Sequence, residues 1–524
     1  MSDIFESCTI GIEFGTTRVK AVLVDENAEV KASGTASWEN HLIGGIWTYS
    51  MGEVKETLQS CYLDLKKSCV RQYGEVPKKV ASIGVSALMH GFLPLGEDRE
   101  PLVPFRTWRN TMTAEAAAVL SEAFGYNIPQ RWGIAHLYQA ILNDEPEVKD
   151  LKTLSCLSVY VTEKLTGQVS VGLGEASGLF PISYETLDYD ERMIGIFEDL
   201  IRDRAYPWNI RDVLPKAKKA GETAGHLTAQ GALYIDPEGD LEPGIAVAAP
   251  EGDAETGMVA TNTIRPGTAS VSAGTSAFTL MVMDHLPNPH PEIAVLSTPD
   301  GFPAANVHGS NCTSDLNAWV SLFSEVVNLT GHPADREELF TKLFEHSKEA
   351  DPDAGGLLSY NYYAGEAVTH INEGRPVFAR MENAEFSLAN FMRLQVFSAF
   401  ATMTLGLDIL EKEENVRASA VTAHGGLFKT PGVADRILSA ALRAPVKTMK
   451  TASEGGPFGM ALLAAYSVRK KEGETLPDFL GRFAFRNTDY TEVMATEEEI
   501  EGYRVFLERY RKAFPLEIDA TRFL

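Results

Sequence analysis

The chain has 524 residues, of which 44 per cent are apolar and 23 per cent charged, as expected for a folded globular protein of two large domains. Its 72 acidic and 47 basic residues give a formal charge of −25, which argues against nucleic acid and against an anionic membrane as partners. The five cysteines are widely spread and form no CxxC or Cys/His pattern, so neither a disulfide framework nor a zinc site is expected.

The amino-terminal sequence lacks the basic and apolar regions of a signal peptide. No uninterrupted apolar run approaches the ~18 residues that cross a bilayer. We therefore expect a cytoplasmic protein that does not associate with membranes. The sequence leaves the oligomeric state open, a homodimer included.

The first predicted elements are two strands, "IGIEF" and "VKAVLVD", joined by Gly15, Thr16 and Thr17. One interpretation is a plain hairpin, because glycine permits the backbone angles that such turns need. The other is a phosphate site, in which backbone N–H groups and two hydroxyls bind an anion while Glu13 holds a metal. The turn by itself does not decide between them.

Predicted strands and helices alternate through the rest of the first half, which indicates an α/β fold. The helices are "VKETLQSCYLDLKKSCV", "AEAAAVLSEAF", "AHLYQAIL" and "SVYVTEKLTG", the last ending at Gly167. The strand "VASIGVSAL" is followed by Met89 and His90, and Trp108 and Asn110 come soon after. A single histidine is usually structural, but an aromatic plane and polar side chains near strand ends also suit a polyol.

A passage rich in glycine and proline, "DPEGDLEPGIAVAAPEGDAETG", separates the two halves. We expect Glu251, Asp253 and Glu255 to lie in a loop between an apolar strand and a helix that begins near Ala254. Asp253 then either caps this helix or accepts a proton from a substrate hydroxyl, and the two roles are compatible.

The opening pattern returns after this passage. "TASVSAGTSAFTLMV" again places two β-branched runs around a short polar turn, here Gly274, Thr275 and Ser276. Two such units, one opening each half, indicate two versions of one fold that face each other. A polyphosphate bound between two domains requires hydrogen-bond donors on both sides, and two opposed turns of this kind would supply them.

The second half continues with a long predicted helix over 387–414, whose core positions are Leu388, Phe391, Met392, Phe397 and Phe400. In "VTAHGGLFKT", Gly425 and Gly426 follow a strand, where missing side chains let a flat ring or a phosphate approach the backbone.

Two helices are predicted near the carboxyl terminus. Glu454, Gly455 and Gly456 begin a helix of small residues, which close packing and ligand contact explain equally well. The last helix opens with a capping box from Thr496 to Glu499. Its apolar face consists of Ile500, Tyr503, Leu507 and Tyr510.

Taken together and in this order, the motifs resemble those of the FGGY family of carbohydrate kinases, from about residue 9 to residue 468. They are "IGIEFGTTRVKAVLVD", "SALMHG", "LTG", "GEASG", "EGDAETGMVATNTIRPGTASVSAGTSA", "AGE" at 364–366, "HGGLFKT" and "SEGGPFGMALLAAY". The resemblance implies two domains of the ribonuclease-H or actin type, with ATP and a sugar in the cleft between them.

The resemblance also implies roles for single residues. Asp253 matches the catalytic base, and Glu13 stands at the position linked to Mg²⁺. The expected nucleotide and phosphate contacts are Gly15, Thr16, Thr17, Lys20, Gly274, Thr275, Gly425 and Gly426. The expected substrate contacts are Met89, His90, Trp108, Asn110 and Asp253. Met89 and His90 resemble the xylulokinase form of the substrate motif.

This chain departs from the family pattern at three places. Glu13 replaces an aspartate, which bears on the metal geometry. Asn110 and Met112 replace a carboxylate and a basic residue in the segment resembling Trp-Asn-Asp-Gly-Arg, and Leu88 replaces a glutamine. The last two departures bear on the identity of the sugar.

We therefore expect an ATP- and Mg²⁺-dependent kinase that phosphorylates a hydroxyl of a ketose, a pentulose such as xylulose. The expected domains are 1–255, which binds the sugar and carries the first phosphate loop, 256–490, which binds the nucleotide, and a packing helix over 491–524. Alternatives are a kinase for another sugar or polyol, such as ribulose or a deoxyhexulose, and an actin-like ATPase or sugar sensor. The sequence does not identify the sugar or the hydroxyl.

Overall fold

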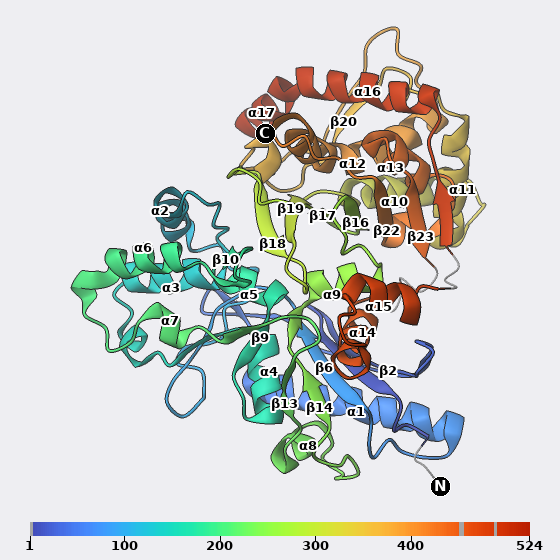
Figure 1. Cartoon of the computed structure of the whole chain (residues 1–524). Coiled ribbons are helices and arrows are strands. Elements are labelled where there is room, and N and C mark those ends of the chain that lie inside the picture. Colours follow the sequence, from blue (N-terminus) through green and yellow to red (C-terminus); the bar gives the residue numbers. More distant parts are fainter. Residues whose placement is uncertain (1–3, 450–454, 487–489) are drawn as a thin grey trace.

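The computed structural model describes residues 4–449, 455–486 and 490–524, which form two α/β lobes (Figure 1). The first lobe is built on a sheet with the order β13-β14-β6-β1-β2-β3, in which β15 also pairs with β6. Its strands are β1 (Thr9–Phe14), β2 (Arg18–Val24), β3 (Val30–Ser37), β6 (Ser82–Ala87), β13 (Thr223–His226), β14 (Ala246–Ala248) and β15 (Glu251–Gly252).

The second lobe is built on a sheet with the order β18-β19-β17-β16-β22-β23-β24. Its strands are β16 (Thr268–Ala273), β17 (Ala277–Val282), β18 (Ile293–Ser297), β19 (Pro303–Gly309), β22 (Ala420–His424), β23 (Val446–Met449) and β24 (Tyr490–Val493). Smaller two-stranded pairs are β4 (His41–Ile43) with β5 (Ile46–Thr48), β7 (Leu93–Leu95) with β8 (Thr153–Ser155), β9 (Ser170–Gly172) with β12 (Lys216–Lys218), β10 (Ile182–Ser183) with β11 (Asp188–Tyr189), and β20 (Leu358–Tyr360) with β21 (Val377–Ala379).

The two sheets repeat one arrangement at their centres. In the first, β1 pairs antiparallel with β2 and parallel with β6. In the second, β16 pairs antiparallel with β17 and parallel with β22. Each predicted Gly-Thr turn therefore joins the same two strands of its sheet, which confirms both hairpins and the two-lobed α/β fold.

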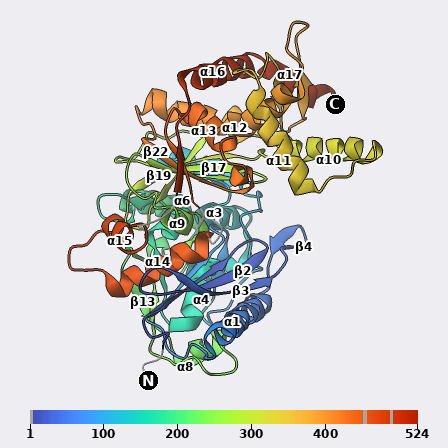
Figure 2. The same ribbon diagram turned by 90° about the vertical axis from the view of Figure 1, so that its right-hand side faces the viewer.

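Helices cover both sheets and fill the space beside them (Figure 2). The first part of the chain supplies α1 (Met51–Tyr73), α2 (Ala114–Phe124), α3 (Gly133–Leu142), α4 (Leu157–Thr166), α5 (Leu173–Leu179), α6 (Glu191–Ile201), α7 (Ile210–Val213), α8 (Ala229–Ile235) and α9 (Asp253–Ala260). The second part supplies α10 (Ser314–Leu329), α11 (Arg336–His346), α12 (Leu388–Glu413), α13 (Ala434–Leu442), α14 (Gly455–Arg469), α15 (Leu476–Phe483), α16 (Glu497–Lys512) and α17 (Phe514–Phe523). The predicted end of α4 is confirmed, since Gly167 adopts φ 70° there.

Helix α14 crosses from the second part of the chain to the first sheet, where Figures 1 and 2 both show it beside the blue strands. The hydroxyl of Thr9 donates to the carbonyl of Ala461 at 3.2 Å, and that of Ser82 to the carbonyl of Ala464 at 2.7 Å. The approach is close because Gly11 has no side chain: a Cβ there would lie 2.0 Å from the Pro457 carbonyl oxygen. The domain bounds 1–255 and 256–490 stay predictions, and α14 lies on the first sheet although its residues fall in the second range.

The core of the second lobe contains the long helix α12, which begins after the cap Ser387. Phe391, Met392, Phe397 and Phe400 are buried as predicted. The prediction was wrong for Leu388, which is 44 per cent exposed because it occupies the first turn, ahead of the packed part of the helix. By length and composition α12 is apolar enough to cross a membrane, but 78 per cent of its most apolar window is buried inside the fold.

At the carboxyl terminus the predicted packing helix is α16, followed by the short helix α17. The capping box between Thr496 and Glu499 is confirmed. Tyr503, Leu507 and Tyr510 are buried, while Ile500 lies at the edge of the interface. The five cysteines are all free and buried.

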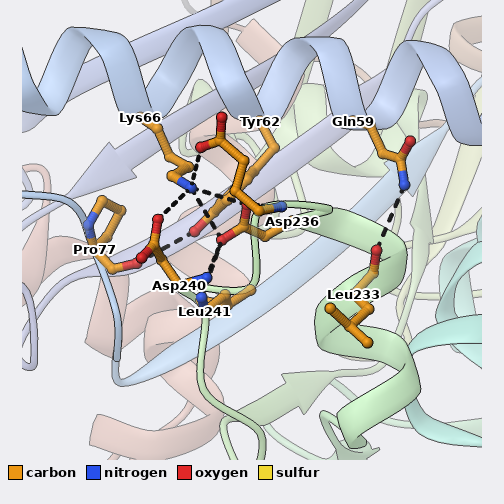
Figure 3. A network of polar contacts seen from close by, with 9 residues as sticks. Gln59, Tyr62, Lys66, Pro77, Leu233, Asp236, Asp240 and Leu241 are labelled. Atoms are coloured by element: carbon orange, nitrogen blue, oxygen red, sulfur yellow. Dashed lines mark hydrogen bonds and ion pairs between the residues drawn. The ribbon is translucent and has the colours of Figure 1, made fainter.

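A buried lysine joins α1 to the loop after α8 (Figure 3). The ammonium group of Lys66 lies 2.9 Å from an oxygen of Asp236, 2.8 Å from Glu238 and 2.7 Å from Asp240. Asp236 is fully buried and also accepts backbone N–H groups of its own loop, including that of Leu241. The loop therefore arranges three carboxylates around one cation, which is supplied by the chain itself.

Candidate active site

Hydrogen bonds accepted by its carbonyl oxygens fix the conformation of the first predicted phosphate loop. The carbonyl of Gly15 accepts from the Trp38 indole at 2.8 Å, that of Thr16 from the Tyr49 hydroxyl at 2.6 Å, and that of Thr17 from the Trp38 backbone at 3.2 Å. In the described part of the chain, no acceptor is recorded for the N–H groups or hydroxyls of the two threonines. The turn therefore presents donors, as an anion site requires.

The second loop is held in the same way. The carbonyl of Gly274 accepts from the hydroxyl of Thr313 at 2.8 Å, and the carbonyl of Thr275 accepts from the N–H of Cys312 at 2.9 Å. Gly274 and Thr275 are exposed, and no bond from the Thr275 N–H or hydroxyl is recorded among the described residues. Both turns thus direct donors outward, which a plain hairpin does not require.

Gly425 lies directly against the second loop. It follows β22 with φ 114°, and a Cβ there would lie 2.1 Å from the carbonyl oxygen of Ala273, the residue before Gly274. Only glycine fits both the backbone angle and the space. The short helix that begins at Gly426 therefore starts beside the second loop, as an adenosine contact next to a phosphate site would.

Glu13 lies near the carboxyl end of β1, a central strand of the first sheet, and its neighbours influence its pKa. It faces Lys20 across the β1–β2 pair, and its Oε1 lies 2.1 Å from the position of a Cβ at Gly456, at the start of α14. Burial, and then the negative charge of Asp253, raises the pKa of Glu13 to about 7, while Lys20 lowers it. Glu454, predicted at the same helix start, lies outside the described residues.

Asp253 is the first residue of α9, not its cap, because Gly252 holds the capping position. Its Oδ1 accepts the backbone N–H of Met89 at 3.0 Å. Burial raises the pKa of Asp253 to about 6, against the backbone hydrogen bonds that lower it. The carboxylate thus sits where β6 and β15 end, and Figures 1 and 2 show α9 between the two lobes.

The sequence analysis placed Glu251 and Glu255 in a loop, and this prediction was wrong, because both carboxylates lie in the core. Glu251 belongs to β15 and Glu255 to α9, and both are buried together with Glu175 of α5. The sequence prediction failed because a single strand pair and a helix start carry no periodic signal. Oε2 of Glu251 accepts the N–H of Glu175 at 2.9 Å. Burial raises the pKa of Glu251 to about 8 and those of Glu175 and Glu255 well above the usual value.

The predicted substrate residue His90 lies in a strained turn after β6. Its φ is 71°, an uncommon angle for a residue with a side chain, and such strain is often found at functional sites. The ring is 5 per cent exposed and stacks on Trp132 with 6.3 Å between centroids. Its Nδ1 has no hydrogen-bond partner among the described residues. Met89, equally buried, joins this turn to Asp253.

The other two predicted substrate residues differ in exposure. Trp108 is 40 per cent exposed. Asn110 is buried. Its Oδ1 accepts the backbone N–H of Trp47 at 2.9 Å, and its Nδ2 donates to the carbonyl of Trp47 at 2.9 Å. Its remaining donor contact goes to the Thr107 carbonyl. Asn110 therefore holds the β5 segment in place with both ends of its amide.

Two charged or titratable groups at the junction of the lobes carry no sequence signal. Arg131 precedes α3, and its carbonyl accepts the N–H of Gly91 at 3.1 Å. Burial is the largest cause that lowers the pKa of both His90 and His308, and the positive charge of Arg131 is the second. His308 lies near the end of β19, opposite Phe278. Neither Arg131 nor His308 falls in a repeat or a periodic pattern, so the sequence analysis did not single them out.

The family of the chain follows from its match to two domain models. The model described as the N-terminal domain of the FGGY family of carbohydrate kinases matches residues 8–259, and the C-terminal model matches residues 269–468. The chain belongs to this family. The family and the enzyme class expected from the resemblance are thereby confirmed.

This carbohydrate kinase is 23 per cent identical over 526 aligned residues to the xylulose kinase of Haemophilus influenzae, covering 96 per cent of this chain and 98 per cent of that one. Among solved structures it is similar to a protein described as a "xyloylose kinase" from Brucella ovis, with TM-score 0.79, 18 per cent identity and 97 and 99 per cent coverage. A gluconate kinase from Lactobacillus acidophilus gives TM-score 0.78 at 17 per cent identity, with 96 and 97 per cent coverage. At such identities these structures establish the shared fold, not the sugar.

The donor set around Glu13 fits Mg²⁺ carried by a nucleotide. No group of three or more His, Cys, Asp and Glu side chains arranged for a metal occurs among the described residues of this kinase. Magnesium in phosphoryl-transfer enzymes does not need one, since one or two carboxylates, waters and substrate phosphates suffice. Glu13 and Asp253 interact electrostatically at the site edge, and a divalent cation would relieve their repulsion.

Proposed function

We propose that this kinase transfers the γ-phosphate of ATP to a hydroxyl of an open-chain sugar, with Asp253 as the general base. The observation that carries the proposal is the position of the Asp253 carboxylate, which the Met89 N–H fixes at the strand ends of the first sheet. The two Gly-Thr turns give the proposal further support, because both present hydrogen-bond donors for phosphate oxygens.

In the proposed reaction, Asp253 accepts the proton of the sugar hydroxyl while its oxygen attacks the γ-phosphorus. The bond from that phosphorus to the bridging oxygen breaks, and ADP leaves. A pKa of about 6 keeps Asp253 ionised at neutral pH and places its basicity nearer to that pH than for an ordinary aspartate, which suits a general base. Donors from Thr16, Thr17 and Thr275, together with Lys20, would neutralise charge on the phosphoryl oxygens.

Glu13 would hold Mg²⁺ directly or through water, and the ion when bound supplies positive charge to the phosphate oxygens. Gly15 and Gly274 would let the phosphates approach the two turns, and Gly425 and Gly426 would receive the adenosine. The backbone is open at Gly426, where a Cβ would meet nothing within 4 Å, and at Gly274, where the nearest atom would lie 3.9 Å away.

For the acceptor, a ketose of the pentulose type such as xylulose is the first sugar to test. Its support is the Met89–His90 pair beside Asp253 and the xylulose kinase name of the Haemophilus influenzae relative. Trp108 would cover the sugar, and Asn110 would act through the β5 segment it holds. Ribulose and deoxyhexuloses are the alternatives within this class. We also expect the protein to act in the cytoplasm.

The test is ADP release with Mg²⁺-ATP and a panel of ketoses, polyols, aldoses and sugar acids, each compared with a blank that lacks sugar. Strong stimulation by one acceptor is the expected result. A hydrolysis rate that no sugar changes would overturn the proposal and favour the ATPase or sensor alternative.

A further inference from the structure

A pocket in the second lobe has no part in the proposed reaction. It has a volume of about 340 Å³ and lies where α12, α13, α16 and the short 3₁₀ helix Ser347–Glu349 meet. Figures 1 and 2 both show strands of the second sheet between α12 and α13 on one side and α9, which carries Asp253, on the other. The pocket is therefore separate from the proposed base, and its volume falls in the range of about 300–1,000 Å³ that small-molecule sites have.

The lining of this pocket combines buried apolar side chains with positive charge. The apolar part is contributed mainly by α12 and α13 and consists of Phe397, Val433, Ile437 and Ala440, all buried. The charged part is more exposed and consists of Lys348, Arg393, Arg436 and a single carboxylate, Glu499. The whole chain has 72 acidic and 47 basic residues, so three cations against one carboxylate are a local reversal of its charge.

The one carboxylate of the lining is already used by the fold. Oε1 of Glu499 accepts a hydrogen bond from Nε of Arg436 at 2.5 Å, and Oε2 accepts the backbone N–H of Thr496 at 2.8 Å in the capping box of α16. For the two terminal nitrogens of Arg436, no partner is recorded in the described part of the chain. Glu499 thus partners one cation of the pocket and leaves donors of the same guanidinium available.

Arg393 has no ion-pair partner among the described residues. Its terminal nitrogens donate to two backbone carbonyls, that of Asp351 at 3.0 Å and that of Lys348 at 3.4 Å, and its Nε is buried without a partner. The carboxylate of Asp351 accepts the amide of Asn390 at 2.8 Å instead. Burial lowers the pKa of Arg393, although the charges of Glu499 and Asp351 raise it. A partly buried guanidinium with only carbonyl acceptors favours the arrival of an anion.

Lys348 can turn toward the pocket at little cost. Its ammonium group pairs with Glu345 at 2.7 Å on the surface, and exposed pairs of this kind contribute little to stability. A Cβ at Gly432 would lie 3.7 Å from Nζ of Lys348, so the ammonium group already lies beside the start of α13. Lys348 and Arg436 therefore approach the pocket from two different elements.

We propose that this pocket binds a small phosphomonoester with an apolar body, at a site separate from that of the nucleotide. The inference goes beyond the proposed function and does not depend on it. Guanidinium and ammonium groups bind phosphate oxygens through charge-assisted hydrogen bonds, and three cations suit a dianion better than a single carboxylate. Phe397 and the aliphatic side chains beside it would cover the apolar body, a part of the pocket that inorganic phosphate would leave to water.

Isothermal titration calorimetry of the wild-type protein with three matched probes tests the inference. Phenyl phosphate carries both the dianion and an apolar ring, inorganic phosphate only the charge, and phenol only the ring. With saturating Mg²⁺-ADP present to fill the nucleotide site, we expect phenyl phosphate to bind once per chain and at least about tenfold more tightly than the other two.

Three results would overturn the inference. Equal affinities for phenyl phosphate and inorganic phosphate would show an adventitious anion only. Binding that occurs without Mg²⁺-ADP and disappears in its presence would place the probe in the nucleotide site. No saturable binding of phenyl phosphate up to about 10 mM would refute the site itself.

Substitutions assign the binding to this pocket. Arg436→Gln should weaken phenyl phosphate at least about tenfold, and Lys348→Gln, at an exposed position that the fold does not need, about threefold. Lys342→Gln is the matched control, since Lys342 also pairs with a glutamate on the surface, Glu338 at 2.6 Å, but does not line the pocket. Ala440→Met should weaken phenyl phosphate more than inorganic phosphate, because it fills the apolar part. Unchanged affinity in both charge variants, with melting temperatures showing folded protein, would mean that the probe binds elsewhere.

Discussion

The backbone N–H of Met89 donates a hydrogen bond to Oδ1 of Asp253 over 3.0 Å. The two residues are 164 positions apart in the chain, and the contact joins the end of β6 to the start of α9. Because the donor is backbone, the orientation of the carboxylate depends on the strand and not on which side chain stands at position 89.

Asp253→Asn should lower kcat for sugar phosphorylation about 10³-fold, because an amide cannot accept the hydroxyl proton. The amide oxygen still accepts the Met89 N–H, so the fold and the dissociation constant of Mg²⁺-ATP should change little. Glu255→Gln, in the same helix, is the matched control and should keep most of the activity. Wild-type turnover in Asp253→Asn, measured by coupled ADP release, would show that another group is the base.

The rate should also report the ionisation of this carboxyl. The pKa of Asp253 is raised to about 6, so the base is lost as the pH falls through that value. We expect kcat/KM to fall roughly tenfold per unit below about pH 6 and to be level just above it. A profile that stays level down to pH 4.5, with the protein still folded by circular dichroism, would contradict the assignment.

Gly456→Ala should impair the enzyme through Glu13. The new Cβ would lie 2.1 Å from Oε1 of Glu13, so the carboxylate or the start of α14 must move. We expect a higher Mg²⁺ requirement and at least about a tenfold loss of kcat/KM. Gly257→Ala is the control, because a Cβ on that glycine of α9 meets nothing within 4 Å. Equal activity in the two variants would mean that Glu13 does not serve the site.

Glu251 should make the fold less stable as the pH rises. Its pKa is about 8 in the folded protein and about 4.5 when unfolded, so the folded state binds the proton more tightly. The resulting stabilisation is complete below about pH 4.5 and is lost as the pH rises through about 8, with a slope of at most about 1.4 kcal/mol per unit. In Glu251→Gln the melting temperature should depend less on pH over this range. An unchanged slope would mean that Glu251 ionises as freely as in the unfolded chain.

Lys66→Met should destabilise the first lobe by about 3–5 kcal/mol, because three carboxylates would remain around the place of the ammonium group. Carboxylate oxygens are ligands for Ca²⁺, so millimolar Ca²⁺ should recover part of the melting temperature in this variant and none in the wild type. Lys67→Met, the neighbouring substitution on α1, controls for loss of charge. Equal melting temperatures of the two variants would show that the network contributes little.

The sequence predicts well what is local. Gly167 ends α4 and the Thr496–Glu499 box begins α16, since caps depend on residues within one turn. The two Gly-Thr hairpins were also predictable, because strand, turn and strand are contiguous. Leu388 shows the limit of periodicity, which gives the face of a helix but not how far the packed part extends.

The site depends on contacts that no local pattern records. The partner of Asp253 is a backbone N–H far away in the chain, and the space for Glu13 exists because Gly456 of α14 lies against β1. The motif predicted that Asn110 contacts the sugar, but both the oxygen and the nitrogen of its side-chain amide form hydrogen bonds with the backbone. Arg131 could not be predicted either, because its electrostatic effect on His90 and His308 arises only from the fold.

The packing of α14 on β1 and β6 has a consequence for synthesis of the protein on the ribosome. The first sheet is complete in sequence once β15 has emerged, but the helix that covers β1 ends only at Arg469. Until then the apolar strands of a half-made chain stay uncovered and open to chaperones or to aggregation. A nascent chain stalled near residue 440 should therefore be far more sensitive to protease in its first 260 residues than one stalled at the full length.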